Sequence, residues 1–145
     1  TVEWLVEQAE DRGDWILVEG QGSLDHPAYS AVTLALIHGA TPHGMILVHK
    51  VGTIEHDFDH LPDVSFPIAS LPGFIAIHEQ VAGLVAPSRV VAVALNTSLY
   101  SDDDDARRII AETAAETGLP TDDPVRFGAE RLWGAVHDRM LELVP

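Results

Sequence analysis

The stretch Trp15-Ile16-Leu17-Val18-Glu19-Gly20-Gln21-Gly22-Ser23 decides the fold class of this 145-residue chain. Its first four residues form an unbroken apolar run, which is typical of a strand buried on both faces of a parallel sheet. An acid and two glycines follow at once, and glycines permit the tight turn that must end such a strand. We therefore expect residues 19–23 to lie at the carboxyl end of a strand, where open α/β sheets bind their ligands.

Apolar runs and helical periodicities alternate along the rest of the chain. Residues 51–67 are polar, contain prolines and lack a period, so we expect a loop there. The helix expected at 27–39 is apolar nearly all round, which predicts that it is buried. Ser101 is the expected N-cap of the fourth helix. Further strands are expected at 45–48, 89–95 and 124–127, and helices at 1–12, 27–39, 71–84, 102–116 and 129–143.

This order of elements predicts an α/β domain with a mostly parallel sheet and helices on both faces. We expect residues 1–145 to form a single domain. Apolar residues make up 46% and charged residues 21% of the chain, as in ordinary globular proteins. No apolar stretch approaches the roughly 20 residues that a membrane helix needs.

The charge balance excludes several classes of partner. The chain has 23 acids against 8 bases and a formal net charge of −15. Such a chain repels phosphate backbones and anionic lipid surfaces, so we expect neither nucleic-acid nor membrane binding. It has no cysteine, which excludes disulfides, thiolate metal sites and cysteine nucleophiles. No secretory signal is visible at the start, and we expect a cytoplasmic protein.

Glu19 is the first candidate functional residue. An acid at the end of an apolar strand is where P-loop proteins hold Mg²⁺, directly or through water. A simple strand-to-helix turn would use the same glycines, Gly20 and Gly22. The usual partner of such a strand is missing, because no Gly-x-x-x-x-Gly-Lys-[Ser/Thr] occurs and the only lysine is Lys50. The chain itself therefore cannot form an ordinary phosphate-binding loop.

Two other expected strands also end in polar residues. His49 and Lys50 follow one, and Lys50 is a candidate ligand for a substrate carboxylate or a coenzyme phosphate. Asn96 and Thr97 follow the next, where related P-loop proteins often place a base-reading asparagine. A turn-forming asparagine is equally common after a strand, and both interpretations stay open.

Histidines supply the remaining candidates. His26 follows the glycine loop, where an imidazole can transfer protons near neutral pH or can merely cap the next helix. His56 and His60 are four residues apart, as helical metal ligands would be. Their loop-like, acidic surroundings favour a solvated loop instead. Ser23 follows a glycine turn, but no Gly-x-Ser-x-Gly motif supports a serine hydrolase.

The run from Val18 to Leu34 closely resembles the signature of a bacterial family long catalogued as a domain of unknown function, the DgcN-like D-glutamate N-acetyltransferases. The matching residues here are Val-Glu-Gly-Gln-Gly-Ser-Leu-Asp-His-Pro-Ala-Tyr-Ser-Ala-Val-Thr-Leu. Further matches lie at 35–39, at 94–97, and at 118–120 with 123–126, so the resemblance covers about residues 14–126. Ala31 departs from the glycine that the family favours, and position 25 is expected to vary.

The resemblance implies an N-terminal Rossmann-like domain followed by a C-terminal P-loop domain, of which this chain is the later part. The phosphate-binding loop would lie upstream. The implied reaction is acetyl transfer from acetyl-CoA to the amine of a D-amino acid such as D-glutamate. Glu19 or His26 would act as the base, and backbone N–H groups of 20–23 would stabilise the oxyanion. The expected ligand-binding residues are Gly20, Gln21, Gly22, Ser23, Tyr29, Ser30, Lys50, Asn96 and Thr97.

Two rival functions remain. The strand end is also similar to that of dethiobiotin synthetases, which implies an ATP-dependent ligase or kinase with Glu19 on Mg²⁺ and Asn96 on adenine. The third class is a non-catalytic nucleotide sensor or an oligomerisation domain. In every case we expect a small-molecule ligand and a homo-oligomer. Use of acetyl-CoA without ATP turnover separates the first function from the second.

Overall fold

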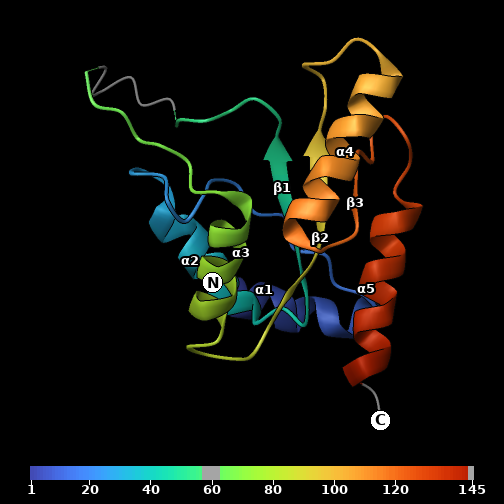
Figure 1. The fold of residues 1–145 in the computed structure, drawn as a ribbon. Helices are drawn as coiled ribbons and strands as arrows, with labels where there is room; N and C mark the ends of the chain where they lie inside the picture. The colour runs from blue at the N-terminus through green and yellow to red at the C-terminus, as the bar shows by residue number, and fades with distance from the viewer. Residues whose placement is uncertain (57–62, 144–145) are drawn as a thin grey trace.

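The computed structural model describes residues 1–56 and 63–143 and contains a small parallel sheet between helices (Figure 1). The sheet has the strand order β1-β2-β3, and both pairs of neighbours are parallel. The elements in chain order are α1 (Val2–Ala9), the 3₁₀ turn η1 (Glu10–Arg12), α2 (Ser30–Ala40), β1 (Met45–Lys50), α3 (Leu71–Ala82), β2 (Val90–Asn96), α4 (Asp103–Thr117), β3 (Thr121–Asp122) and α5 (Glu130–Leu143). The predicted α/β class with parallel strands is confirmed.

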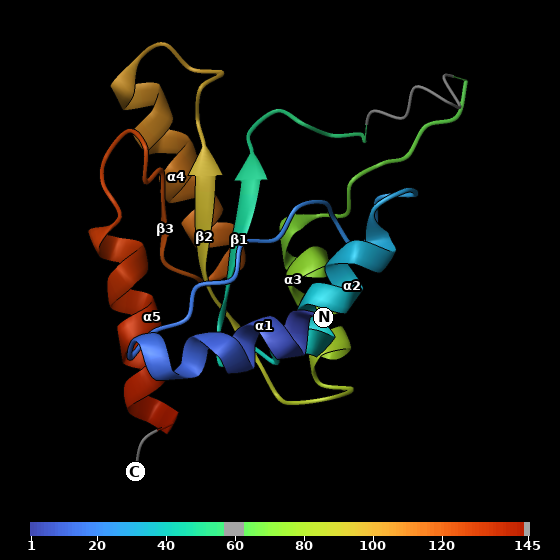
Figure 2. The same cartoon turned by 180° about the vertical axis from the view of Figure 1, so that it is seen from behind.

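The central strand β2 divides the core into two halves because its side chains alternate between the faces of the sheet. Val93 and Leu95 face α4 and pack with Ile110. Ala92 and Ala94 face the opposite way and pack against Leu132 of α5. Figures 1 and 2, seen from opposite sides, show α3 and α4 on one face and α5 on the other.

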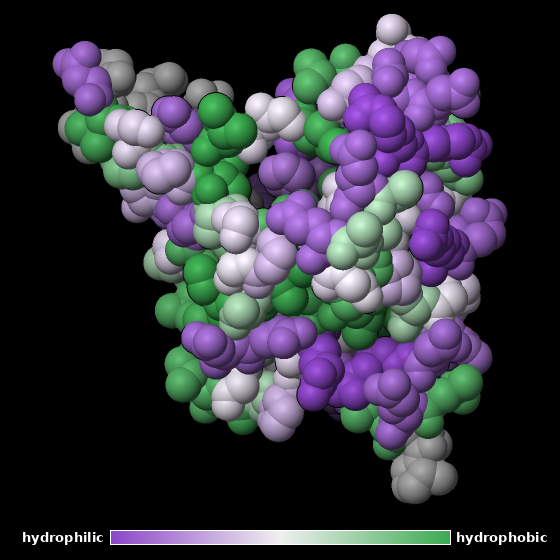
Figure 3. Space-filling model, in the orientation of Figure 1, coloured by the Kyte–Doolittle hydropathy of each residue, from purple (hydrophilic) through white to green (hydrophobic). Residues whose placement is uncertain are grey.

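The helices begin and end close to their predicted bounds, with one correction at α4. Asp102, not Ser101, is its N-cap, and its carboxylate accepts from the N–H groups of Asp104 and Asp105. A carboxylate is the better cap here because it also interacts with the positive end of the helix dipole. In Figure 3 the most hydrophilic side chains gather over the part of the molecule where Figure 1 places α4.

The strand predicted at 15–18 does not form, which is the main correction to the sequence analysis. These residues have no regular secondary structure, and their exposed fractions range from 37% at Ile16 to 83% at Leu17. Trp15 rests on Trp133 of α5, whereas Leu24 packs into the cluster of Leu47 on the other face. The segment therefore passes round the open side of β1 (Figure 2), and within the described residues no strand pairs with it.

Two smaller predictions are also wrong. The helix α2 is not buried all round, because Val32 and Leu34 are 50% and 39% exposed. Residues 124–127 form a turn, not a strand, and β3 comes earlier. The turn forms because the N–H groups of Val125 and Arg126 donate to the carboxylate of Asp123 and so are not available to a sheet.

No helix among residues 1–56 and 63–143 has the length and apolar character needed to cross a lipid bilayer.

Candidate functional site

A cavity of about 540 Å³ lies at the carboxyl ends of β1 and β2. Its walls come from the end of β2, from the loop after β2 and from the turn after β3. The lining residues are Val48, Ala94, Leu95, Asn96, Thr97, Ser98, Tyr100, Asp123, Pro124, Val125 and Arg126. This is the edge at which the sequence predicts a site, and the volume is within the range of small-molecule sites.

The register of the sheet brings two predicted ligand-binding residues together at this edge. Lys50 is the partner of Asn96 across the β1–β2 pair. The Asn96 side chain folds back, and its Oδ1 accepts from the backbone N–H of Ser98 at 3.0 Å. The turn-forming interpretation of Asn96 is therefore confirmed. Its Oδ1 is engaged in that turn, whereas an amide nitrogen has two N–H groups of its own to donate.

Asp123 ties the two walls of the cavity together. Its Oδ2 accepts from Thr97 N at 2.9 Å and from Thr97 Oγ1 at 2.6 Å, while Oδ1 accepts from Val125 N and Arg126 N at 3.0 and 3.1 Å. Burial raises the pKa of Asp123, but the bonds from Thr97, Arg126 and Val125 outweigh it and hold the pKa below its ordinary value. The backbone N–H and the hydroxyl group of Thr97 both donate to the Asp123 carboxylate. The role of Thr97 in ligand binding stays a prediction.

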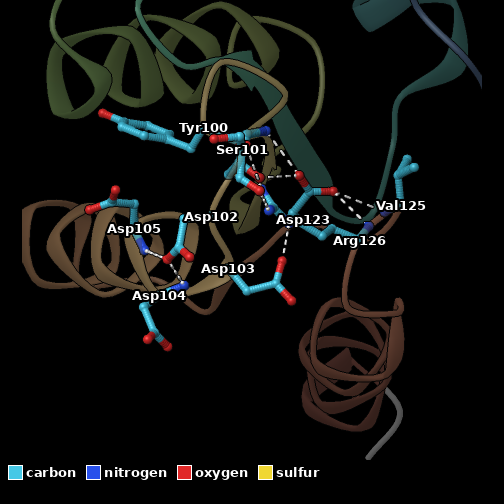
Figure 4. Close-up of polar contacts among 10 residues, drawn as sticks. Tyr100, Ser101, Asp102, Asp103, Asp104, Asp105, Asp123, Val125 and Arg126 are labelled. Atoms are coloured by element: carbon cyan, nitrogen blue, oxygen red, sulfur yellow. Dashed lines mark hydrogen bonds and ion pairs between the residues drawn. The ribbon is translucent and has the colours of Figure 1, made fainter.

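Arg126 joins the turn after β3 to the start of α4 (Figure 4). Its Nε donates to Asp103 Oδ1 at 2.6 Å, and its two terminal nitrogens donate to the carbonyls of Tyr100 and Ser101 at 2.9 and 3.1 Å. The guanidinium is therefore held by three acceptors at the rim of the cavity. Two of its five N–H groups, one on each terminal nitrogen, take no part in these three bonds.

The glycine loop 19–23 lies apart from the lining of this cavity. Glu19 is exposed, and its neighbour Gly20 leaves room for a side chain. Gly22 has φ +96°, and a Cβ there would lie 2.7 Å from Tyr29 Cβ. Gly22 therefore has to be glycine, both for its left-handed backbone and for its close approach to the start of α2. Gln21 and Ser30 also lie on this side of the molecule, and their predicted roles remain predictions.

A polar cluster forms beside this loop around Asp25. The carboxylate of Asp25 accepts from Ser23 Oγ, from the backbone N–H of Ala69 at 3.2 Å, and bonds His56 Nε2 at 2.8 Å. Burial raises the pKa of Asp25, but the bonds from Ser23, Ala69 and His56 together lower it below its ordinary value. These hydrogen bonds connect the segment that precedes α2 with His56 and with Ala69, on either side of residues 57–62.

His26 is buried at the edge of this cluster. Its ring lies 4.6 Å from that of Tyr29 and 4.9 Å from that of His56, centroid to centroid. Its Nδ1 accepts from the backbone N–H of Ala28 at 3.0 Å. A neutral imidazole that accepts at Nδ1 carries its proton on Nε2, so this geometry makes His26 a donor at Nε2.

The sequence favours a solvated loop over a metal-binding pair at His56 and His60, and His60 lies among residues 57–62, outside the described residues. His56 itself bonds Asp25. Within the described part of the chain no group of three or more His, Cys, Asp or Glu residues is arranged to hold a metal ion.

Sequence reasoning assigned no role to Asp25, Asp123 or Arg126. Asp123 and Arg126 stand in a stretch that carried the family resemblance, but a motif alone does not show that one carboxylate collects four donors. Asp25 meets residues more than 30 positions away, and no local pattern signals such a contact.

A parallel sheet with helices on both faces and a cavity at its carboxyl edge is the arrangement of ligand-binding α/β domains. The model of one protein family, described as "Domain of unknown function (DUF1611_C) P-loop domain", matches residues 1–133. The chain belongs to this family.

Two named relatives and the solved structure of a third protein support the assignment to this family. Two proteins called D-glutamate N-acetyltransferase, from Tritonibacter scottomollicae and a Pseudoalteromonas species, are 32% and 34% identical over 94% and 81% of this chain. The crystal structure of a DUF1611 family protein from Anabaena variabilis matches 94% of the chain with a TM-score of 0.85 and 43% identity. The chain spans only 39% and 34% of the two named relatives and 39% of the solved chain.

Proposed function

We propose that this chain is the later part of an N-acetyltransferase that moves an acetyl group from acetyl-CoA to the amine of a D-amino acid such as D-glutamate. The observation that carries the proposal is the name shared by the two relatives, whose matches cover 94% and 81% of the chain. The cavity at the end of β2 supports it, because it offers an apolar floor at Val48 and Ala94 for a planar group such as adenine.

The reaction needs a base and a group that stabilises negative charge. The amine nitrogen attacks the thioester carbonyl, its proton passes to the base, and the tetrahedral intermediate collapses with release of the CoA sulfur, which takes up the proton. We assign the role of base to the exposed Glu19, and the stabilisation of negative charge to the backbone N–H groups of residues 20–23.

The substrate carboxylates require cations. Lys50 lies at the cavity edge beside Asn96 and is exposed, so it is our candidate for a carboxylate of the amino acid or a phosphate of the coenzyme. Arg126 is less suited because Asp103 and two carbonyls already hold it.

The family description as a P-loop domain favours a nucleotide as the second candidate ligand, with ATP and Mg²⁺ in a ligase or kinase. In that function the exposed Glu19 would hold Mg²⁺ together with the phosphates of the nucleotide, because Mg²⁺ in such sites is bound through one or two carboxylates.

The test uses a polypeptide of the relatives' length that contains these residues. It is incubated with acetyl-CoA and D-glutamate, free CoA thiol is followed by a colour reagent, and N-acetylglutamate is identified by mass spectrometry. Glu19→Gln should lower turnover about a hundredfold, the scale expected for a lost general base, with folding intact. Glu7→Gln, on exposed α1, is the matched control. Turnover of ATP without acetyl transfer would overturn the proposal in favour of a ligase or kinase.

A further inference from the structure

A second cavity, of about 310 Å³, lies on the opposite side of β1 from the first. Its walls come from the end of β1 and the segment after it, from the start of α3 and from one side of α4. Side chains alternate along a strand, so Val48 lines the first cavity and its neighbour His49 lines this one. In Figure 3 the surface is hollowed between α4 and the segment that leaves β1. Neither residues 19–23 nor Lys50, to which we assign the acetyl transfer, line it.

Thr113 of α4 is a buried polar residue whose hydroxyl group opens into this cavity. The residue is 6% exposed, and within the described part of the chain its hydroxyl group takes part in no hydrogen bond, although its carbonyl accepts from Thr117 Oγ1. Among the described residues, Ser88 Oγ is the one unsatisfied side-chain atom that is fully enclosed, so Thr113 Oγ1 keeps access to the cavity. A buried hydroxyl group without a partner costs free energy, and a polar ligand would supply that partner.

Glu116 gives the same end of the cavity a negative charge. Ile109, Thr113 and Glu116 recur at helical spacing and line the cavity together, so one face of α4 carries all three. Glu116 forms no ion pair with a lysine or an arginine of the described residues. Burial lowers the pKa of His49, and the nearby Glu116 raises it by less, so the imidazole is neutral at pH 7. A carboxylate, a neutral imidazole and a hydroxyl group all have oxygen or nitrogen lone pairs that accept from a protonated amine.

The start of α3 gives the cavity a group of the opposite polarity. Its N-cap Ser70 and its first residue Leu71 both line the cavity. The Ser70 side chain makes no capping bond, and Pro72 has no N–H group. Phe74 N donates to Ser70 O, whereas the N–H groups of Leu71 and Gly73 find no acceptor among the residues that the structure describes. Unbonded N–H groups and the positive end of the helix dipole together attract a carboxylate.

The walls between these two ends are apolar. Ile54, Ile68 and Ile109 contribute branched side chains, and no lysine or arginine is among the described residues that line the cavity. A dicarboxylate such as glutamate would bring a second negative charge into a cavity that already contains Glu116. An amino acid with an apolar side chain instead offers one cation, one anion and a hydrocarbon group, and the cavity has a matching surface for each.

We propose that this cavity binds a free amino acid with an apolar side chain. Its ammonium group lies among Glu116, Thr113 and His49, its carboxylate lies at the start of α3, and its side chain packs against the isoleucines. The bound amino acid is not the acyl acceptor of the proposed reaction, because an amine held against a carboxylate keeps its proton and cannot attack a thioester. The cavity is therefore a second ligand site, and its assignment does not depend on the proposed function.

Calorimetric titration with racemic leucine tests the ligand class. It is carried out on the 145-residue chain and on a polypeptide of the relatives' length. Leucine should bind both at least about tenfold more tightly than 4-methylpentanoate, which lacks the amine, leucinamide, which lacks the carboxylate, or racemic glutamate. Equal or weaker binding of leucine would overturn the proposal. Binding to the shorter polypeptide alone would also overturn it, because another segment of the longer one would then fill the cavity.

Two variants of α4 test the location of the site. Thr113→Val keeps the shape of the side chain and removes the hydroxyl group, and Glu116→Gln removes the charge. Each should weaken leucine binding about tenfold, with the circular dichroism spectrum unchanged, because neither group has a hydrogen-bond partner among the described residues. Asp104→Asn, at the other end of α4 and outside both cavities, is the matched control and should leave the affinity unchanged. Unchanged affinity in either test variant would overturn the proposal.

Nuclear magnetic resonance of the wild-type chain gives a measurement that does not depend on any variant. Leucine should shift the backbone amide signals of residues 49–54, 68–71 and 109–116, which surround the second cavity. Shifts confined to residues 19–23 or 94–98 would place leucine elsewhere and overturn the proposal.

Discussion

The change Asp123→Asn replaces one oxygen by an NH₂ group in a carboxylate that is 4% exposed and accepts four hydrogen bonds. If the NH₂ faces the turn, it meets two N–H donors and both bonds are lost. If it faces Thr97, the hydroxyl can rotate to accept, but the Thr97 N–H still loses its partner. The second arrangement is the less costly of the two.

The cost follows from these bonds. One buried N–H left unsatisfied costs about 1–3 kcal/mol, and the bonds that remain change from charge-assisted to neutral, which removes roughly another 1 kcal/mol. We expect Asp123→Asn to lower the free energy of unfolding by about 3 kcal/mol, or the melting temperature by roughly 10 °C for a domain of this size. The matched control is Asp104→Asn, an exposed acid of α4, which should change stability by less than about 0.5 kcal/mol.

Urea unfolding followed by circular dichroism measures both variants, at pH 7 and again at pH 3. The folded-state pKa of Asp123 lies below its ordinary value, so its stabilisation is complete above that value and is lost as the pH falls through the folded pKa. The difference in the free energy of unfolding between the wild type and Asp123→Asn should therefore become smaller below about pH 4. Equal unfolding midpoints at pH 7 would refute the four-bond account of Asp123.

Three further predictions follow from the other features of the chain. Gly22→Ala, with φ +96° and Tyr29 Cβ 2.7 Å away, should cost more than about 2 kcal/mol by chemical unfolding, whereas Gly118→Ala, with φ +71° and open space, should cost only about 1 kcal/mol of backbone strain. Asp25→Asn should destabilise the chain at pH 7 but progressively less below about pH 4 in urea titrations, because the folded-state pKa of Asp25 is lowered. The 145-residue chain should bind acetyl-CoA or ATP weakly or not at all, since it lacks a phosphate loop; micromolar affinity by calorimetry would contradict this.

Most helices and strands were predictable because the residues that mark their type and their ends lie within or directly beside each element. The run 89–95 is apolar enough to be a central strand, and glycine and acids mark the ends of α4, so these elements form where expected. The run 15–18 has the same apolar signal but fails as a strand. Strand formation needs a partner, and composition does not show whether one is present.

The site was predictable in place but not in detail. Lys50 and Asn96 meet because parallel strands end at one edge, which topology alone predicts. The contacts of Asp123 with Thr97 and of Asp25 with His56 depend on how distant loops fold together. Such contacts are fixed by tertiary packing, and a single sequence carries no periodic signal for them.

The bonds of Arg126 also bear on the thermodynamics of ligand binding. This side chain and Asp123 join the loop at 97–101, the turn at 123–127 and the first turn of α4 into one unit before any ligand arrives. Arg107 lies 3.9 Å over the Phe127 ring and adds a further connection to α4. A rim that is already ordered loses little conformational entropy on binding, so more of the contact energy remains as affinity. Removing the hydrogen bond between Asp103 and Arg126 should therefore lower the affinity for the ligand, because the rim would lose more conformational entropy on binding. Asp103 itself does not line the cavity.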